Sequence, residues 1–137
     1  MFLRVNVWFW RIAFWITWSI CTVLFLTPAS GLPPIDIWDK AVHAMVFVVL
    51  MMLLIPAHTK HLTIFPLAGL LTAYGVLVEI GQLFVPGRSF SVLDMVADTI
   101  GVIMALAANH LLQTVYALHT VHARQTVHAR QTTAKDK

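Results

Sequence analysis

The sequence predicts an all-α membrane protein with four antiparallel transmembrane helices and both termini in the cytoplasm. Hydrophobic residues make up 59% of the chain and charged residues 11%, whereas soluble domains hold about 45–50% and about 25%. Four apolar runs of about 20 residues are each long enough to cross a bilayer. A single domain of 137 residues is also too small to bury so much apolar surface away from water.

The first apolar run, Trp8 to Leu26, predicts the first transmembrane helix. Four tryptophans lie between residues 8 and 18, which is typical of a helix end held at the membrane interface. Arg11 can extend to the headgroups from there. The alternative is a cleaved signal peptide, with Arg4 in its charged region and the cut near residues 27–31. The tryptophans and the interruption at Arg11 favour a transmembrane helix.

Turn-forming residues set the limits of the second helix. A loop rich in Pro, Ser and Gly at residues 28–34 precedes Asp36. Asp36 is a candidate N-cap, and Asp39 stands three residues later in a relation like that of a capping box. We expect the helix to run from about Ile37 to Ile55 and to end at Pro56.

The third and fourth helices are separated by a Pro-Gly turn. A short basic turn at residues 57–63 precedes the third helix, which we expect from about Ile64 to Phe84. Pro86 and Gly87 form the next turn. The fourth helix is expected from about Val92 to Leu112, where the sequence becomes polar.

A repeated hexamer marks the C-terminal tail. The sequence Thr-Val-His-Ala-Arg-Gln begins at Thr120 and is repeated without change from Thr126. One duplication does not predict a solenoid. We therefore divide the chain into a four-helix transmembrane domain at residues 1–118 and a disordered basic tail at residues 119–137.

The distribution of lysine and arginine predicts the orientation. Short loops predict that neighbouring helices are antiparallel. Seven of the nine basic residues lie at the two ends of the chain or in the second loop. The other two, Lys40 and Arg88, lie on the opposite side. Since cytoplasmic loops carry the excess of lysine and arginine, both termini are expected in the cytoplasm.

This orientation brings ionisable residues of three helices to one depth. His43 lies seven residues after Asp36, Glu79 seven residues before Pro86 and Asp98 six residues after Val92, or about 10 Å at helical rise in each case. Asp39 shares a helix face with His43, and Asp94 shares one with Asp98, because each pair is four residues apart. Ionisable groups are costly within a membrane and usually mark a functional site.

The same residues resemble the VanZ family of bacterial membrane proteins. The resemblance covers about residues 36–105, the motif core, and is carried by Asp39-Lys40-x-x-His43, Glu79-x-x-Gln82, Pro86-Gly87-Arg88, Asp94 and Gly101. It implies a multi-pass protein of the bacterial cytoplasmic (inner) membrane and cell envelope. The namesake is associated with resistance to the glycopeptide antibiotic teicoplanin. No established reaction comes with the resemblance, and the positions of Asp98 and Ala105 are often Asn and Gly in the family.

The candidate functional cluster combines acids, bases and amides. His43 is either hydrogen-bonded to Glu79 or Asp98, or handles a proton, since histidine titrates near neutrality. Glu79 needs an opposite charge to stay ionised, and Lys40 and Arg88 are the candidates. No catalytic residue, metal ligand or cofactor is assigned. The cluster comprises Asp39, Lys40, His43, Glu79, Gln82, Arg88, Asp94 and Asp98.

Three function classes fit this cluster. The leading one is a protein that binds or shields an anionic lipid headgroup or cell-wall precursor through Lys40 and Arg88. The second is an enzyme that acts on an envelope lipid or precursor by acid–base catalysis or with a divalent metal, through Glu79, His43, Asp94 and Asp98.

The third class is a proton-coupled carrier. Four helices leave little room for alternating access unless the chain forms a homo-oligomer. An enzyme is disfavoured because the sequence has no activated nucleophile and no standard zinc spacing. The net charge of +3 is too small to predict binding to nucleic acid. The expected partner is therefore the lipid bilayer.

Overall fold

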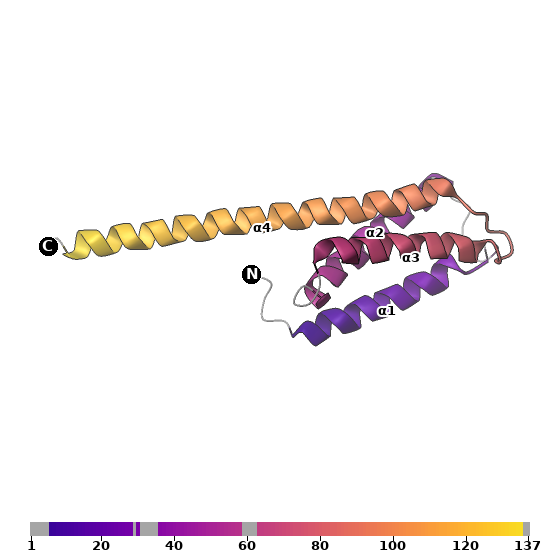
Figure 1. Ribbon diagram of the computed structural model, residues 1–137, viewed down its shortest axis with the longest axis horizontal. Coiled ribbons are helices and arrows are strands. Elements are labelled where there is room, and N and C mark those ends of the chain that lie inside the picture. Colours follow the sequence, from indigo (N-terminus) through magenta and orange to yellow (C-terminus); the bar gives the residue numbers. More distant parts are fainter. Residues whose placement is uncertain (1–5, 29, 31–35, 59–62, 136–137) are drawn as a thin grey trace. The chain divides into compact units, whose positions relative to one another are not determined.

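The computed structural model describes residues 6–28, 30, 36–58 and 63–135, with the side chains of 36–39 and 126–135 outside this description. The regular secondary structure of the described residues is helical (Figure 1), and all four helices are long and apolar enough to cross a membrane. The predicted all-α class with four candidate spans is confirmed. The helices are α1 (Val7–Phe25), α2 (Asp36–His58), α3 (Ile64–Gln82) and α4 (Val92–Lys135).

Helix α2 ends later than predicted. Pro56 lies inside the helix, which continues to His58, so the predicted end at Ile55 is wrong. Proline lacks the N–H that would bond to the carbonyl four residues earlier, so the helix loses one hydrogen bond close to its end. The carbonyl groups of the last turn have no partner within the helix. One of them, the carbonyl of Ala57, accepts a hydrogen bond of 3.2 Å from Nε of Arg11 on α1.

Helix α3 ends at Gln82, two residues before the predicted end at Phe84. The chain tightens there, because the amide of Phe84 bonds to the carbonyl of Gly81 at 3.1 Å, a three-residue spacing typical of helix ends. Gly87 then adopts a positive φ of 76°, a conformation that glycine adopts without a steric penalty.

Helix α4 continues far beyond the predicted end at Leu112. It runs to Lys135, so the stretch expected to lack regular structure is helical from residue 119 to residue 135. Residues 113–135 contain neither glycine nor proline, and their alanine, arginine and glutamine residues are good helix formers. The chain divides into two compact units, with residues 107–137 separate from residues 2–106.

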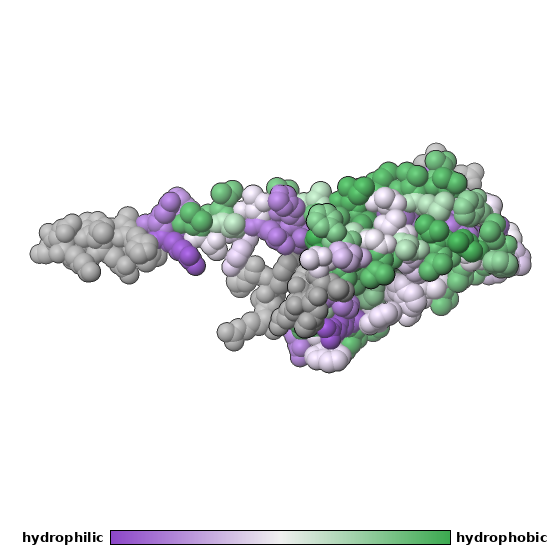
Figure 2. Space-filling model, in the orientation of Figure 1, coloured by the Kyte–Doolittle hydropathy of each residue, from purple (hydrophilic) through white to green (hydrophobic). Residues whose placement is uncertain are grey.

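Residues 2–106 form a helical bundle with an apolar core. Phe47, Leu50 and Met51 of α2 are fully buried, as is Leu67 of α3 at 2% exposure. On the face drawn in Figure 2, hydrophobic residues cover much of the outer surface of this unit. An exposed apolar surface of this extent marks a membrane protein or an interface. The bundle therefore differs from a soluble domain in that its outer surface is apolar as well as its core.

Helices α2 and α4 approach each other closely at Gly101. A Cβ atom added to Gly101 would collide with the backbone carbonyl of Ala44. Small residues at such positions let membrane helices pack backbone to backbone. This contact fixes the start of α4 against the first half of α2, where the predicted cluster residues lie.

Three predictions lie outside the described residues. They are helix capping by the side chains of Asp36 and Asp39, the charged contribution of Arg4, and the basic turn where it covers residues 59–62.

Candidate functional site

Four ionisable side chains from three helices are buried together in the bundle. His43 lies on α2, Glu79 on α3, and Asp94 and Asp98 on α4; none is more than 5% exposed. The structure thus brings together His43, Glu79 and Asp98, which the sequence places at one depth, and adds Asp94 to them. We call these four residues the buried cluster.

The centre of the buried cluster is a contact between a histidine and a carboxylate. Nδ1 of His43 lies 3.0 Å from Oδ1 of Asp98, and both side chains are 1% exposed. The sequence allowed Glu79 or Asp98 as a partner, and the structure shows the contact with Asp98. Phe25 of α1 stacks on the His43 ring, with 4.3 Å between ring centroids and 28° between the planes. Nothing in the sequence singles out Phe25 among the many apolar residues of its helix.

Glu79 is held by a backbone amide. Its Oε2 atom accepts a hydrogen bond of 2.8 Å from the N–H of Ser91. The structure shows Lys40 beside Asp94 instead, and the pairing of Arg88 with Glu79 stays a prediction. Glu79 meets the first residues of α4, where the positive end of the helix dipole interacts favourably with a carboxylate.

Ser91 is the residue that sequence reasoning missed. Its hydroxyl accepts a hydrogen bond of 3.2 Å from the amide of Asp94, so Ser91 caps α4. The signal was present, because Ser91-x-x-Asp94 has the spacing of a capping box directly before an apolar run. That pattern predicts the cap. No pattern in the sequence predicts that the backbone N–H of Ser91 donates to Glu79 on α3.

Lys40 connects the buried cluster to the surface. Its Nζ atom lies 3.4 Å from Oδ1 of Asp94, and the lysine side chain is 44% exposed while that of Asp94 is 6% exposed. Oδ1 of Asp94 makes no hydrogen bond within the described residues. The pair is thus an ion pair that is longer than a charge-assisted hydrogen bond of about 2.8 Å.

Two predicted cluster residues contact α1 instead. Nε2 of Gln82 donates to the carbonyl of Phe25 at 3.1 Å. Arg88 donates from Nε to the carbonyl of Thr27 at 3.2 Å and from Nη2 to that of Leu24 at 3.5 Å. Both side chains serve carbonyl groups at the C-terminal end of α1, which have no partner within the helix.

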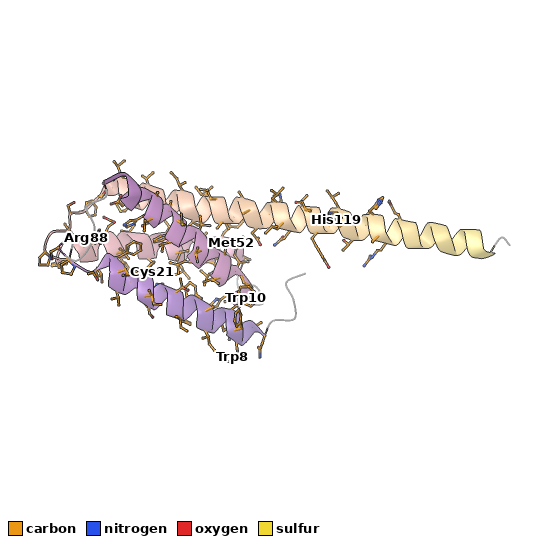
Figure 3. The ribbon with its side chains drawn as sticks, turned by 180° about the vertical axis from the view of Figure 1, so that it is seen from behind. Trp8, Trp10, Cys21, Met52, Arg88 and His119 are labelled. Atoms are coloured by element: carbon orange, nitrogen blue, oxygen red, sulfur yellow. The ribbon has the colours of Figure 1, made fainter. Side chains whose placement is uncertain are left out.

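Residues named in the sequence analysis lie at both ends of the bundle. Figure 3 shows Arg88 at the opposite end of the bundle from Trp8. The side chain of Asp39, also assigned to the cluster, lies outside the described residues. Arg11, predicted to extend to the headgroups, lies with its guanidinium carbon 5.2 Å from the centroid of the Trp8 ring.

Close packing holds Asp98 against α3. A Cβ atom added to Gly75 would lie 2.7 Å from Oδ2 of Asp98 and 3.2 Å from the ring of Phe47. Oδ2 of Asp98 and Oε1 of Glu79 are buried and make no hydrogen bond within the part of the chain that the structure describes. Buried acceptors without a partner are costly and call for an explanation.

The geometry permits metal ligation as well as acid–base chemistry. His43, Glu79 and Asp94 each offer one ligand atom, and these three atoms lie within 4.8 Å of one another. The pair of His43 and Asp98 also has the arrangement in which a carboxylate orients a histidine.

Four helices of membrane-spanning length and a buried cluster of acids and a histidine define a multi-pass α-helical membrane protein. The chain belongs to the VanZ/LLP1 family, whose model matches residues 2–113. The resemblance drawn from residues 36–105 is thereby confirmed, and the match adds α1. Comparison with curated proteins and with solved structures found no match.

Proposed function

We propose that this protein binds an anionic ligand of the bacterial cell envelope, a lipid headgroup or a cell-wall precursor, at the entrance to the buried cluster. The observation that carries the proposal is the position of Lys40. Its ammonium group is anchored by Asp94 at 3.4 Å while 44% of the side chain stays exposed. A lysine held in this way presents a point charge to a phosphate or carboxylate from outside.

The orientation of the chain supports an extracytoplasmic ligand. Lysine and arginine are concentrated at the termini and in the second loop, which favours a cytoplasmic location for both termini in the cytoplasmic membrane. Lys40, Arg88 and Asp94 then lie near the outer headgroups. A protein that binds or shields a cell-wall precursor there is suited to a part in glycopeptide resistance.

Arg88 supports this entrance indirectly. Its hydrogen bonds to the carbonyls of Thr27 and Leu24 fix the end of α1, the helix that supplies Phe25 to the His43 ring. Lys40 is therefore the cation that meets the ligand, and Arg88 positions the wall of the site.

A second function is favoured by the contact between His43 and Asp98. A histidine oriented by a carboxylate acts as a general base in many enzymes. Glu79, one of whose oxygens makes no hydrogen bond within the described residues, is suited to act as the acid. This enzyme would act on an envelope lipid or precursor, and would have to open because both His43 and Asp98 are buried.

Native mass spectrometry of the protein extracted from its membrane tests the proposed ligand. We expect an anionic lipid or precursor to co-purify and to bind again in nanodiscs. Lys40→Ala should weaken binding about fivefold, the effect of about 1 kcal/mol for a partly exposed ion pair. Binding to the unmodified protein should also weaken as salt is raised.

Arg124→Ala provides the matched control, because Arg124 is an exposed basic residue of the C-terminal unit. It should leave binding unchanged. Equal binding by Lys40→Ala and the unmodified protein would overturn the proposal. Release of a chemically altered ligand would favour the enzyme instead.

A further inference from the structure

We propose that His43, Glu79 and Asp94 bind a divalent metal ion. This site goes beyond the anionic ligand and does not depend on it. The three residues come from α2, α3 and α4, are 0%, 0% and 5% exposed, and bring one ligand atom each to within 4.8 Å of the others. Residues so far apart in the chain do not meet in this way through local sequence.

The spacing of the ligand atoms is close to what a metal needs. With bonds of about 2.1 Å, two ligand atoms of a tetrahedral ion lie about 3.4 Å apart. The present limit of 4.8 Å therefore requires the side chains to move inward by about 1 Å, a shift within reach of rotations about their terminal bonds. Three protein ligands leave a coordination position for water or for a ligand oxygen.

Glu79 shows an independent sign of a missing partner. Its Oε2 atom is fixed by the N–H of Ser91 at 2.8 Å. Its Oε1 atom is buried, and no hydrogen bond reaches it from the described residues. A fully buried carboxylate anchored by one oxygen presents the other as a ligand, and a metal ion satisfies it.

His43 contacts a carboxylate, the group that commonly lies beside metal-bound histidines. Asp98 Oδ1 contacts Nδ1 of the ring at 3.0 Å, and a carboxylate in this position orients the ring so that the other nitrogen can ligate. We therefore assign Nε2 as the ligand atom. The stacked ring of Phe25 and the close backbone of Gly75 behind Asp98 hold this arrangement in place.

The charge balance also favours a cation. Glu79, Asp94 and Asp98 are three buried carboxyl groups, and Lys40, which lies 3.4 Å from Asp94, is nearly half exposed. Buried charges need compensation inside the bundle. A divalent ion supplies two positive charges at the point where Glu79 and Asp94 meet.

The donor atoms select the class of metal. Two carboxylates and one imidazole favour a first-row transition ion over Mg²⁺ or Ca²⁺, because the latter take oxygen ligands. The single cysteine of the chain, Cys21, lies on α1 and is not among the three ligands. Zn²⁺ is the expected ion, and Mn²⁺ is the alternative that the carboxylates allow.

Metal titration of the full-length protein in nanodiscs tests the site. After treatment with a chelator, the protein should take up one Zn²⁺ or Mn²⁺ per chain, measured by calorimetry and by elemental analysis, and should unfold at a higher temperature. Glu79→Gln and Asp94→Asn should remove this uptake. Asp98→Asn should weaken it about tenfold to a hundredfold, as loss of an orienting carboxylate does.

The controls separate this site from the histidine-rich end of α4. The double substitution His119→Ala and His122→Ala removes two exposed histidines and should leave uptake unchanged. The proposal is overturned if the unmodified protein takes up neither ion, or if the tail substitution removes the uptake. It is also overturned if Glu79→Gln and Asp94→Asn bind the ion as tightly as the unmodified protein does.

Discussion

His43 and Asp98, which are 55 residues apart in the chain, meet at 3.0 Å in an interior where each side chain is 1% exposed. The contact joins α2 to α4 at the depth where Glu79 reaches the first turn of α4. A polar contact in this position contributes to the stability of the bundle as well as to the chemistry of the site, because neither group can turn to water.

Removing the carboxylate should therefore destabilise the protein. Asp98→Ala should lower the free energy of unfolding by about 3–5 kcal/mol, since it leaves buried polar groups unpaired. Asp98→Asn keeps the shape and should cost less. Unfolding in mixed micelles measures the difference, with Thr99→Ala as the control, because the hydroxyl of Thr99 bonds to the carbonyl of Met95 in its own helix.

Alanine substitutions at three glycines should affect the stability of the protein to different extents, and this order tests the helix packing. Gly101→Ala should cost about 1–3 kcal/mol, since its Cβ would meet the rigid backbone of Ala44. Gly75→Ala should cost less, because the atom it meets is the movable carboxylate oxygen of Asp98.

Gly69→Ala is the matched control for both glycines. Nothing lies within 4 Å of the added Cβ atom there, and alanine is a better helix former than glycine by about 1 kcal/mol. This substitution should be neutral or stabilising. Equal effects at positions 69 and 101 would contradict the close approach of α2 and α4.

Arg88 should stabilise the end of α1. Arg88→Gln removes the hydrogen bonds to the carbonyls of Thr27 and Leu24. The bond to Thr27 is partly buried, and a bond to a charged donor contributes about 1.5 kcal/mol, whereas the bond to Leu24 is exposed at 3.5 Å and contributes less. Hydrogen exchange in the last turn of α1 should become faster. The exchange of α3 should change little, and a uniform increase over all helices would contradict this local effect.

The proposed orientation places the C-terminus in the cytoplasm. A green fluorescent protein fused after Lys137 should therefore fluoresce, whereas alkaline phosphatase fused at the same residue should stay inactive. A phosphatase fused in the third loop, after Arg88, should be active. The reverse pattern would invert the topology and move the buried cluster to the cytoplasmic side.

The sequence predicted the helices better than their ends. Apolar length identifies a span, and the starts of α3 and α4 at Ile64 and Val92 agree with the structure. The end of α2 was misjudged because Pro56 is tolerated in a last turn. The extent of α4 was misjudged because polarity was taken to end the helix, although the residues from 113 to 135 include neither glycine nor proline.

The sequence predicted the depth of the site residues in the membrane but not their hydrogen-bond partners. Counting residues from the turns placed His43, Glu79 and Asp98 at one level. The depth of a residue does not depend on how its helix is rotated about its axis. The choice of Asp98 for His43, and of a backbone N–H for Glu79, depends on how the helices rotate about their axes. Arg88 was assigned to the site as a candidate cationic partner for Glu79. Nothing in the sequence shows that its guanidinium donates to a carbonyl group at the end of α1.

A short cross-link formed within the membrane tests most directly that the helices bring this cluster together. Cys21 is the only cysteine of the chain, so Cys21→Ser gives a background in which His43→Cys and Asp98→Cys form a unique pair. A short bifunctional thiol reagent, which spans side chains too far apart for a disulfide, should cross-link this pair within one chain in native membranes. His43→Cys with Leu70→Cys, an outward-facing position on α3, should not cross-link. Failure of the first pair, or equal reaction of both pairs, would contradict the account.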